Sequence, residues 1–447
     1  MRDIQPRPRI LLVSQEGLYP DFVGGMEVRG AELHEALAHF AEVTVLSRTR
    51  LIEGSASLSA DAPSHPTLTG APCTRSAQLI QRVSWRAGLV AAQRGARRAL
   101  RRQLARVKPD LIYLNSASHL SPPVLHALLT WGTPVVAWFG DRQSRLSHLF
   151  GQGWREQMAG ELGNATRLLP DATMAASVIP EHLQLVFNCR WLHDFYVPQF
   201  PPGTPYHIVY DGVDAEHFAP APAPAPELEL VRTDAPRPVR FTFLGRAVYE
   251  KGLIEFAVAM VRVDARLRAL GNTAPQLEVE IIGDGEALAP ALEILNRAGF
   301  GSRVTALGVC EHSAVPERLR RASVMVTPSR DEALPAATME AMACALPVIA
   351  TDIGGTREVV AHGETGMLVQ VGDADALLDA CMTLAQNSEL RHRFGAAARA
   401  RVLRHFRRHD GIAATVAVMR AAMRGPVVTE RAHHPIEEAR RSAVRSS

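Results

Sequence analysis

The chain has 447 residues, more than one hydrophobic core ordinarily supports, and its 47% hydrophobic and 21% charged residues are typical of a globular protein of two or three domains. The net charge of +3 is too small to indicate nucleic-acid binding, and no apolar run approaches the roughly 18 residues of a membrane-spanning helix. Met1–Arg9 lacks the apolar core of a secretory signal, and the five cysteines are far apart, so we expect a cytoplasmic protein without a metal site.

Apolar runs of four to six residues alternate with helical stretches along the first half. After the first run, Met26–Phe40 has helical spacing. Such alternation predicts a parallel sheet with helices on both faces. Strands are expected at Arg9–Ser14, Val43–Leu46, Leu111–Leu114, Pro134–Trp138 and His207–Tyr210.

The alternation stops at a Pro-Ala repeat, Pro220–Pro226, which favours an extended linker, and then it restarts. Helices are expected at Leu253–Leu270, at Ala287–Ala298 and over much of Leu377–Arg424. Strands are expected at Val239–Leu244, Leu277–Ile282, Val304–Leu307, Val324–Thr327 and Pro347–Ala350. Two doubly wound lobes place a ligand cleft between them, at the carboxyl ends of the strands.

These patterns divide the chain into five segments. They are an N-terminal lobe (1–205), an interdomain strand and linker (206–238), a C-terminal lobe (239–405), a helix expected to return to the N-terminal lobe (406–425) and a tail (426–447). The tail is polar and basic, a composition that favours disorder.

A basic loop follows the strand expected at Val239–Leu244. Gly245 permits a tight turn, and Arg246 and Lys251 precede the next helix. Lys251 is noteworthy because it and Lys108 are the only lysines among 49 basic residues. Two cations beside a helix N-terminus suit a diphosphate, which needs positive charge and backbone donors. A basic surface turn is the alternative.

Two carboxylates flank the start of another predicted helix within Ser329–Ala343 (SRDEALPAATMEAMA). Pro335 suits the first turn, Glu332 lies in the loop before it, and Glu340 lies on the second turn. Glu340 is the single acid in an apolar segment, and a buried carboxylate needs hydrogen-bond donors such as vicinal sugar hydroxyls. The alternative is that both acids only stabilise the helix N-terminus.

Glycine turns follow two more strands. They are Thr351–Glu358 (TDIGGTRE) and Ile282–Glu286 (IGDGE), the second of which contains Gly283. Such glycines let the backbone approach a ligand or a neighbouring strand closely. Each turn alone is common in doubly wound lobes, so the turns indicate a function only through their order along the chain.

The series GR-x4-KG, IIGDGE, S-x2-E-x7-E-A-M-A, PVIATDIGG and G-x2-G-x-L-V, between residues 245 and 369, resembles the C-terminal domain of family 4 retaining glycosyltransferases. In the N-terminal half, Gly24-Gly25-Met26-Glu27 resembles the glycine loop of that family, and Tyr210–Asp214 followed by Phe218 resembles its interdomain turn. The resemblance extends over residues 8–424 and is specific in the C-terminal lobe. It implies the GT-B fold, an α/β fold of two Rossmann-like doubly wound lobes that face each other across a cleft.

The resemblance also implies a retaining, metal-independent transfer of a hexose-type sugar from a UDP- or GDP-linked donor to an acceptor hydroxyl, with no cofactor. In that family's pattern Arg246 and Lys251 hold the diphosphate, Glu332 holds the transferred sugar, and Glu340 holds the ribose hydroxyls. The two glycines of the N-terminal loop close over the donor. The catalytic residues expected on this basis are Arg246, Lys251, Glu332 and Asp141. The donor-binding residues expected are Gly24, Gly25, Gly245, Gly283, Leu334, Pro335, Ala336 and Glu340.

Three positions depart from the family's pattern. Asp211 stands where Asn is more usual, and Ala345 stands where Gly is usual. Pro134–Asp141 (PVVAWFGD) resembles a stretch that commonly carries His before Asp, and here that position is Gly140. Because the His is thought to help on the acceptor side, Asp141 is the candidate polar contact there.

A basic stretch, Arg86–Lys108, carries eight basic residues and no acid, with apolar residues at helical spacing on one side. A helix of this kind can lie on the inner face of an anionic membrane, and the family often uses lipid-linked acceptors. Alternatively, the apolar side packs on the sheet and the arginines are solvated. The expected partners are a nucleotide-sugar donor and a glycan, lipid-linked or small-molecule acceptor, without nucleic acid.

Other functions use related folds. A nicotinamide-dependent oxidoreductase would follow the first strand with G-x-G-x-x-G, whereas Ser14–Pro20 reads SQEGLYP. The E-x7-E series argues against a nucleotide-sugar epimerase or phosphorylase. A catalytically silent subunit that binds nucleotide-sugar or a partner enzyme is the alternative. The family's habits favour glycan or glycolipid assembly, such as bacterial polysaccharide biosynthesis.

Overall fold

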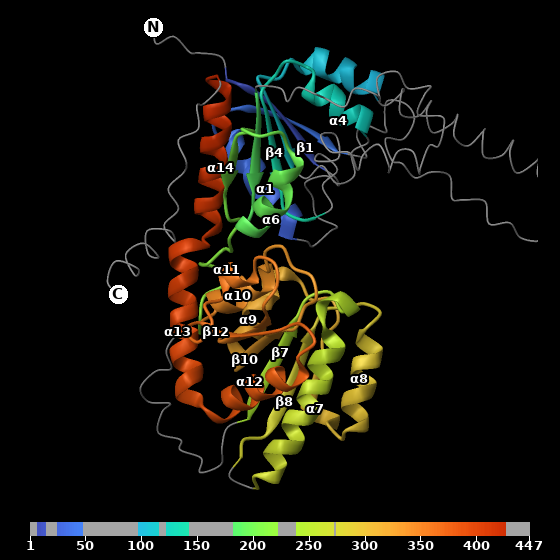
Figure 1. Ribbon diagram of the computed structural model, residues 1–447, viewed down its shortest axis with the longest axis vertical. Coiled ribbons are helices and arrows are strands. Elements are labelled where there is room, and N and C mark those ends of the chain that lie inside the picture. Colours follow the sequence, from blue (N-terminus) through green and yellow to red (C-terminus); the bar gives the residue numbers. More distant parts are fainter. Residues whose placement is uncertain are drawn as a thin grey trace, which may run out of the picture.

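The computed structural model describes residues 7–14, 25–47, 97–115, 122–142, 182–221, 238–271 and 274–425. Within these ranges the chain forms two lobes, each built on a six-stranded sheet whose strand pairs are all parallel (Figure 1). The lobes are stacked along the long axis of the molecule (Figure 1).

The N-terminal sheet has the strand order β2-β1-β3-β4-β5-β6. Its strands are β1 (Arg9–Ser14), β2 (Glu42–Ser47), β3 (Leu111–Asn115), β4 (Val135–Phe139), β5 (Leu183–Phe187) and β6 (Tyr206–Ile208). Its helices are α1 (Gly25–Ala38), a helix over residues 97–107, α4 (Pro122–Leu129), α6 (Arg190–Tyr196) and the short η4 (Val197–Gln199). The helix at 97–107, α4 and α6 pack on one face of the sheet, and α1 packs on the other.

The C-terminal sheet has the strand order β12-β11-β10-β7-β8-β9. Its strands are β7 (Val239–Leu244), β8 (Leu277–Ile282), β9 (Val304–Ala306), β10 (Val324–Thr327), β11 (Val348–Thr351) and β12 (Gly366–Val369). Its helices are α7 (Leu253–Ala269), α8 (Leu288–Arg297), α9 (Val315–Arg321), α10 (Ala336–Ala343), α11 (Thr356–Val359), α12 (Ala374–Gln386) and α13 (Ser388–His405), with short helices η6 (Tyr249–Lys251), η7 (Gly301–Arg303) and η8 (His312–Ala314). Helices α7, α8 and α12 pack on one face, and α9, α10, α11 and α13 pack on the other.

Helix α7 shows how the sequence produces this packing. Leu253, Phe256, Met260, Val263 and Leu267 recur every three or four residues, and all are buried in the core against the sheet. An apolar stripe at that spacing occupies one face of a helix, and its burial stabilises each large side chain by about 1.5–3 kcal/mol. The central strands are buried on both faces, which is why they read as continuous apolar runs.

The chain passes between the lobes at two neighbouring points. The first passage contains Val213, and the second lies where α13 ends and α14 (Arg408–Met423) begins. The two passages are joined by a hydrogen bond of 2.8 Å from the amide of Val213 to the carbonyl of Phe406. Gly411 permits this approach, because a Cβ there would lie 2.2 Å from the carbonyl oxygen of Tyr210. Helix α14 then runs along the N-terminal lobe, where Met419 is fully buried (Figure 1). The last helix therefore ties the two lobes together.

Several details of the sequence analysis change or lie outside the described residues. Strands β5 and β12 were not expected, and Pro335 precedes α10 as its N-cap residue instead of lying in its first turn. Most of the Pro-Ala linker and the tail from residue 426 lie outside the described ranges. In the described part of the basic stretch, Leu100 and Leu104 are fully buried in the core, so this part of its apolar side packs on the sheet. No helix in the described ranges combines the length and the hydropathy needed to cross a membrane.

Candidate active site

The C-terminal sheet has a switch point between β7 and β10, where the chain stops adding strands on one side and begins to add them on the other. Strands β7, β8 and β9 extend to one side of this point, and β10, β11 and β12 extend to the other. The loops that leave neighbouring strands on either side of such a switch point diverge and open a crevice at the carboxyl ends of the strands, where doubly wound folds bind ligands. The expected site residues lie on these two loops: Arg246 and Lys251 follow β7, and Glu332 follows β10.

Lys251 and Glu332 meet in this crevice. The Nζ of Lys251 lies 2.6 Å from the Oε1 of Glu332, and the Oγ of Ser329 donates to the same oxygen at 3.0 Å. The two side chains are 24% and 15% exposed, so the pair is partly desolvated but open to a ligand. Gly252 makes the approach possible, because a Cβ there would lie 2.0 Å from the carbonyl oxygen of Pro328. The structure therefore brings together two residues that are 81 positions apart in the chain.

Arg246 lies on the exposed side of the same loop. Gly245 and Gly283 pack against each other below it, and a Cβ on Gly283 would lie 1.8 Å from the carbonyl oxygen of Gly245. The described residues include no ion-pair partner for Arg246. Its guanidinium is thus a charge at the mouth of the crevice that the C-terminal lobe does not neutralise.

Glu340 lies on α10 and is hydrogen-bonded to a residue that the sequence analysis missed. The Nε2 of His312 lies 2.9 Å from the Oε1 of Glu340, and the Glu340 side chain is 12% exposed. His312 belongs to η8, outside all the motifs, and its ring packs against Phe218 of the interdomain segment. A half-buried carboxylate next to a histidine can accept hydrogen bonds from ligand hydroxyls while it keeps a protein partner.

The loop between Glu332 and α10 carries the other expected donor-binding residues. Leu334 is half-buried and packs against the cores of both lobes, Pro335 is buried, and Ala336 is exposed at the start of α10. Gly354 allows this loop to come close, since a Cβ on it would lie 1.6 Å from the carbonyl oxygen of Glu332.

The N-terminal lobe reaches the crevice through the loop that follows β4. Asp141 is half-buried in this loop, and its carbonyl accepts a hydrogen bond from the Oη of Tyr196 at 3.0 Å. The next residue, Arg142, was not expected: its guanidinium lies 2.6 Å from the carboxylate of Asp331, the neighbour of Glu332. Asp141 is thereby held close to the Glu332 loop. Gly25 is the first residue of α1, and Gly24 lies outside the described residues.

Glu358 of the Thr351–Glu358 motif joins the lobes beside this site. Its carboxylate accepts hydrogen bonds from the backbone amides of Arg190 and Trp191, both at 2.9 Å, and from the Oη of Tyr210 at 2.8 Å. Burial and the nearby Glu358 charge raise the pKa of the Tyr210 phenol above its usual range, so Tyr210 remains a donor. The carboxylate caps the first turn of α6 and thus satisfies two amides that have no partner within that helix.

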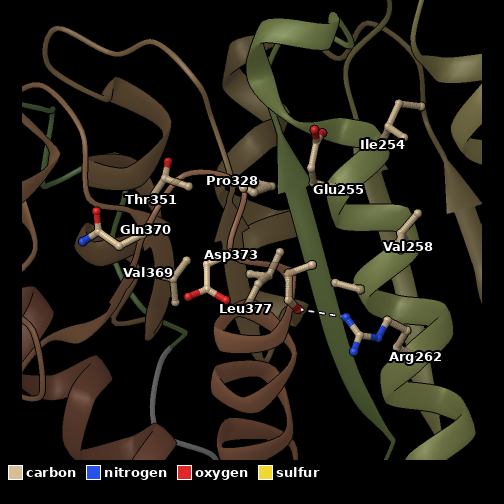
Figure 2. A pocket seen from close by; sticks show the side chains of 13 residues that line it. Ile254, Glu255, Val258, Arg262, Pro328, Thr351, Val369, Gln370, Asp373 and Leu377 are labelled. Atoms are coloured by element: carbon tan, nitrogen blue, oxygen red, sulfur yellow. Dashed lines mark hydrogen bonds between the residues drawn. The ribbon is translucent and has the colours of Figure 1, made fainter.

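A small cavity in the C-terminal lobe lies beside these loops. It measures about 150 Å³ and is lined by α7, by the start of α12 and by residues that include Pro328, Thr351 and Val369; the side chains of the two helices face one another across it (Figure 2). Arg262 on its rim donates to the carbonyl of Ala374 at 3.2 Å. Because ligand pockets commonly measure about 300 Å³ or more, the cavity is too small for a nucleotide.

The sequence profile of the family described as "Glycosyl transferases group 1" matches residues 233–401. N-acetyl-alpha-D-glucosaminyl L-malate synthase of Bacillus anthracis is 33% identical over 152 residues, which are 34% of this chain and 36% of that enzyme. Alpha-maltose-1-phosphate synthase of Mycobacterium tuberculosis is 28% identical over 323 residues, 68% of this chain and 79% of that enzyme. The crystal structure of Anabaena HepE with UDP and glucose shares the fold with a TM-score of 0.57 at 16% identity, over 93% of this chain and 100% of that one. These matches support a glycosyltransferase with the GT-B fold, whose C-terminal lobe matches the group 1 family.

In this glycosyltransferase the matched range extends from just before β7 into α13. Lys251, Glu332, Glu340 and the newly found His312 all lie inside it. Asp141 and the loop before α1 lie outside it, in the lobe where the sequence motifs are looser.

Proposed function

We propose that this glycosyltransferase moves a hexose-type sugar from a UDP- or GDP-linked donor to an acceptor hydroxyl, with retention of configuration and without a metal, in glycan or glycolipid assembly. The observation that carries the proposal is the pairing of Lys251 with Glu332 at the switch point of the C-terminal sheet. A cation and a carboxylate that lie side by side in the crevice suit a ligand in which phosphate oxygens lie next to sugar hydroxyls.

In this proposal Arg246 and Lys251 stabilise the negative charge that develops on the nucleoside diphosphate as it leaves. Charges that are fixed before the reaction and partly shielded from water are well suited to that task. Glu332 then accepts hydrogen bonds from the transferred sugar, and Glu340, held by His312, accepts them from the ribose hydroxyls. Gly245 and Gly283 let the backbone come close to the phosphates.

The acceptor oxygen forms its bond to the anomeric carbon on the face from which the diphosphate departs. The bond from that carbon to the phosphate oxygen breaks, and the acceptor proton passes to a phosphate oxygen. This route needs no pair of catalytic carboxylates of the glycosidase type. In this proposal Asp141 contacts the acceptor; in the structure it precedes Arg142, whose guanidinium pairs with Asp331.

The first test is a thermal-shift assay of the purified protein with UDP, GDP, ADP, UDP-glucose and GDP-mannose, in buffer with EDTA. A ligand at about a hundred times its dissociation constant adds about 2.7 kcal/mol of stability. We expect one nucleotide to stabilise the wild type, and Lys251→Ala and Glu340→Ala to lose most of that shift. Glu293→Gln, an exposed change on α8, is the matched control and should keep it.

If the shift survives both substitutions, the donor site has been placed wrongly. If no member of the panel binds, the result favours the alternative interpretation of a catalytically silent subunit. Retention is checked separately by NMR of the anomeric proton of the product, where an inverted signal would contradict the mechanism. Loss of turnover with EDTA would contradict metal independence.

The acceptor is left to experiment, since the two relatives are named for different products. The match to the malate synthase covers about a third of that enzyme, so its substrates do not transfer to this chain. Membrane contact through Arg86–Lys108 also stays a prediction. Because Leu100 and Leu104 are packed into the core, the described part of that helix could contact a membrane through its basic side chains and few apolar ones.

A further inference from the structure

Among the described residues, His312 is the hydrogen-bond partner of the Glu340 carboxylate. Its Nε2 lies 2.9 Å from the Oε1 of Glu340, whose side chain is 12% exposed. Because a carboxylate can only accept hydrogen bonds, this nitrogen carries a hydrogen and is the donor. The two oxygens of a carboxylate have about four acceptor positions, so one bond to His312 leaves Oε2 and part of Oε1 for a ligand. The carboxylate can therefore still accept from two neighbouring hydroxyls.

The His312 ring is itself held by the interdomain segment. It packs edge-on against Phe218, with 5.1 Å between the ring centroids. The guanidinium of Arg399 donates to the carbonyl of Phe218 at 2.7 Å and also to the carbonyl of Ala343, the last residue of α10. Because Glu340 lies on α10 as well, the helix that carries the carboxylate and the ring that holds it are anchored to the same segment.

The bond from His312 fixes the Glu340 side chain before a ligand arrives. A glutamate side chain has several rotatable bonds, and restricting it to one rotamer on binding costs free energy. A hydrogen-bond partner that is already in position increases affinity mainly because this cost has been met beforehand. The increase is limited to ligands that bond to the carboxylate, since other ligands gain nothing from its position.

We propose that His312 is a positioning residue for nucleotide binding, which holds Glu340 in the orientation that accepts both hydroxyls of the donor's ribose. The inference rests on the proposed function, in which Glu340 binds that ribose. Because the orientation of the carboxylate affects only those hydroxyls, His312 determines how strongly the protein prefers a ribonucleotide to an analogue without them. Direct contact between His312 and the nucleotide is not required.

The test uses titration calorimetry to measure the dissociation constants of UDP or GDP, whichever the wild type binds, and of its 2′,3′-dideoxy analogue. The main variant is His312→Phe, which keeps an aromatic ring beside Phe218 and removes the donor to Glu340. We expect its affinity for the ribonucleotide to fall by about tenfold, as for the loss of one well-placed hydrogen bond, and its affinity for the analogue to stay unchanged. His312→Gln, whose amide nitrogen can replace Nε2 as donor, should regain most of the loss.

Two further proteins complete the comparison. His217→Phe makes the same change in a ring that lies 6.1 Å from that of His312, and in the described structure His217 forms no hydrogen bond with Glu340. This matched control should keep both affinities. In a Glu340→Ala background, His312→Phe should have no further effect, because its influence passes through the carboxylate.

An equal loss of affinity for the ribonucleotide and for its analogue would show that His312 only supports the fold, and it would overturn the inference. The same holds if His312→Phe keeps the wild-type preference, or if it still weakens binding in the Glu340→Ala background. Failure of the proposed function would give different results. The wild type would then bind neither UDP nor GDP, or its preference for the ribonucleotide would survive Glu340→Ala, and the inference would fall with the proposed function.

Discussion

Close backbone approaches determine where the side chains of the site can lie. At Gly252, Gly283 and Gly354 a Cβ would lie 2.0 Å or less from a carbonyl oxygen of a neighbouring loop. Each of the three also has a positive φ, which an L-residue with a side chain rarely adopts. Lys251 and Glu332 are brought into contact because the loops that carry them pack backbone to backbone at Gly252, while Gly283 and Gly354 pack these loops against the loops of the neighbouring strands.

Gly140 differs from these three because its close neighbour is a side chain. We expect Gly140→Ala to destabilise the protein by about 2 kcal/mol, since the new Cβ overlaps the Trp138 ring and the ring is held under Arg29. The free energy of unfolding in urea measures the effect. In a Trp138→Phe background the same change should cost much less, because the ring is smaller. An equal loss in both backgrounds would contradict the steric explanation.

The short edge strand β6 is stabilised by side chains as well as by its ladder. Its three residues pair with β5, and the Nε2 of His207 lies 3.1 Å from the Oε1 of Gln184 on that strand. Burial lowers the pKa of His207 below its ordinary value, because the charged imidazolium is poorly solvated there. The strand that leads to the first passage between the lobes is therefore sensitive to acid.

The sign of this sensitivity follows from proton binding. As the pH falls below about 6.5, the unfolded chain binds a proton at His207 before the folded chain does, so stability is complete above this pH and decreases below it. We expect His207→Gln, which keeps a partner for Gln184, to remove a slope of at most about 1.4 kcal/mol per pH unit. Urea unfolding of both proteins between about pH 5 and 7.5 measures the difference. Identical slopes would show that His207 is not responsible.

At the scale of the whole molecule, polar contacts between described residues of the two lobes lie beside the site. They include the Arg142–Asp331 ion pair, the Cys189 thiol, which donates to the Ala333 carbonyl at 3.4 Å, and the Glu358 carboxylate. Burial raises the pKa of Cys189 above its usual range, so the thiol keeps its proton and acts as a donor. Asp331 and Ala333 flank Glu332, so these contacts join the loop that carries Glu332 directly to the N-terminal lobe.

The sequence predicted the parts of this arrangement that are written in contiguous patterns. Apolar periodicity placed most strands of both sheets, and motif order indicated the family and the GT-B fold, which the comparisons confirm. It missed β5, whose apolar run LQLVF is interrupted by Gln184, and residues such as His312, Arg142 and Arg29, which act on partners far away in the chain. Such pairings depend on the packing of the lobes, and no local spacing encodes them. The expected roles of the site residues stay predictions.

Glu358 should control how firmly the lobes are joined. Its carboxylate is the acceptor for two amides at the start of α6 and for the Tyr210 hydroxyl. In Glu358→Gln one of the two oxygens is replaced by an NH2 group, which cannot accept from these donors. We therefore expect faster hydrogen exchange at the Arg190 and Trp191 amides and a larger radius of gyration in solution scattering, because contact between the lobes becomes less favourable. The exposed Glu364→Gln is the control and should change neither quantity. If Glu358→Gln leaves both amides as protected as in the wild type, other contacts hold the lobes together, and Glu358 only caps α6.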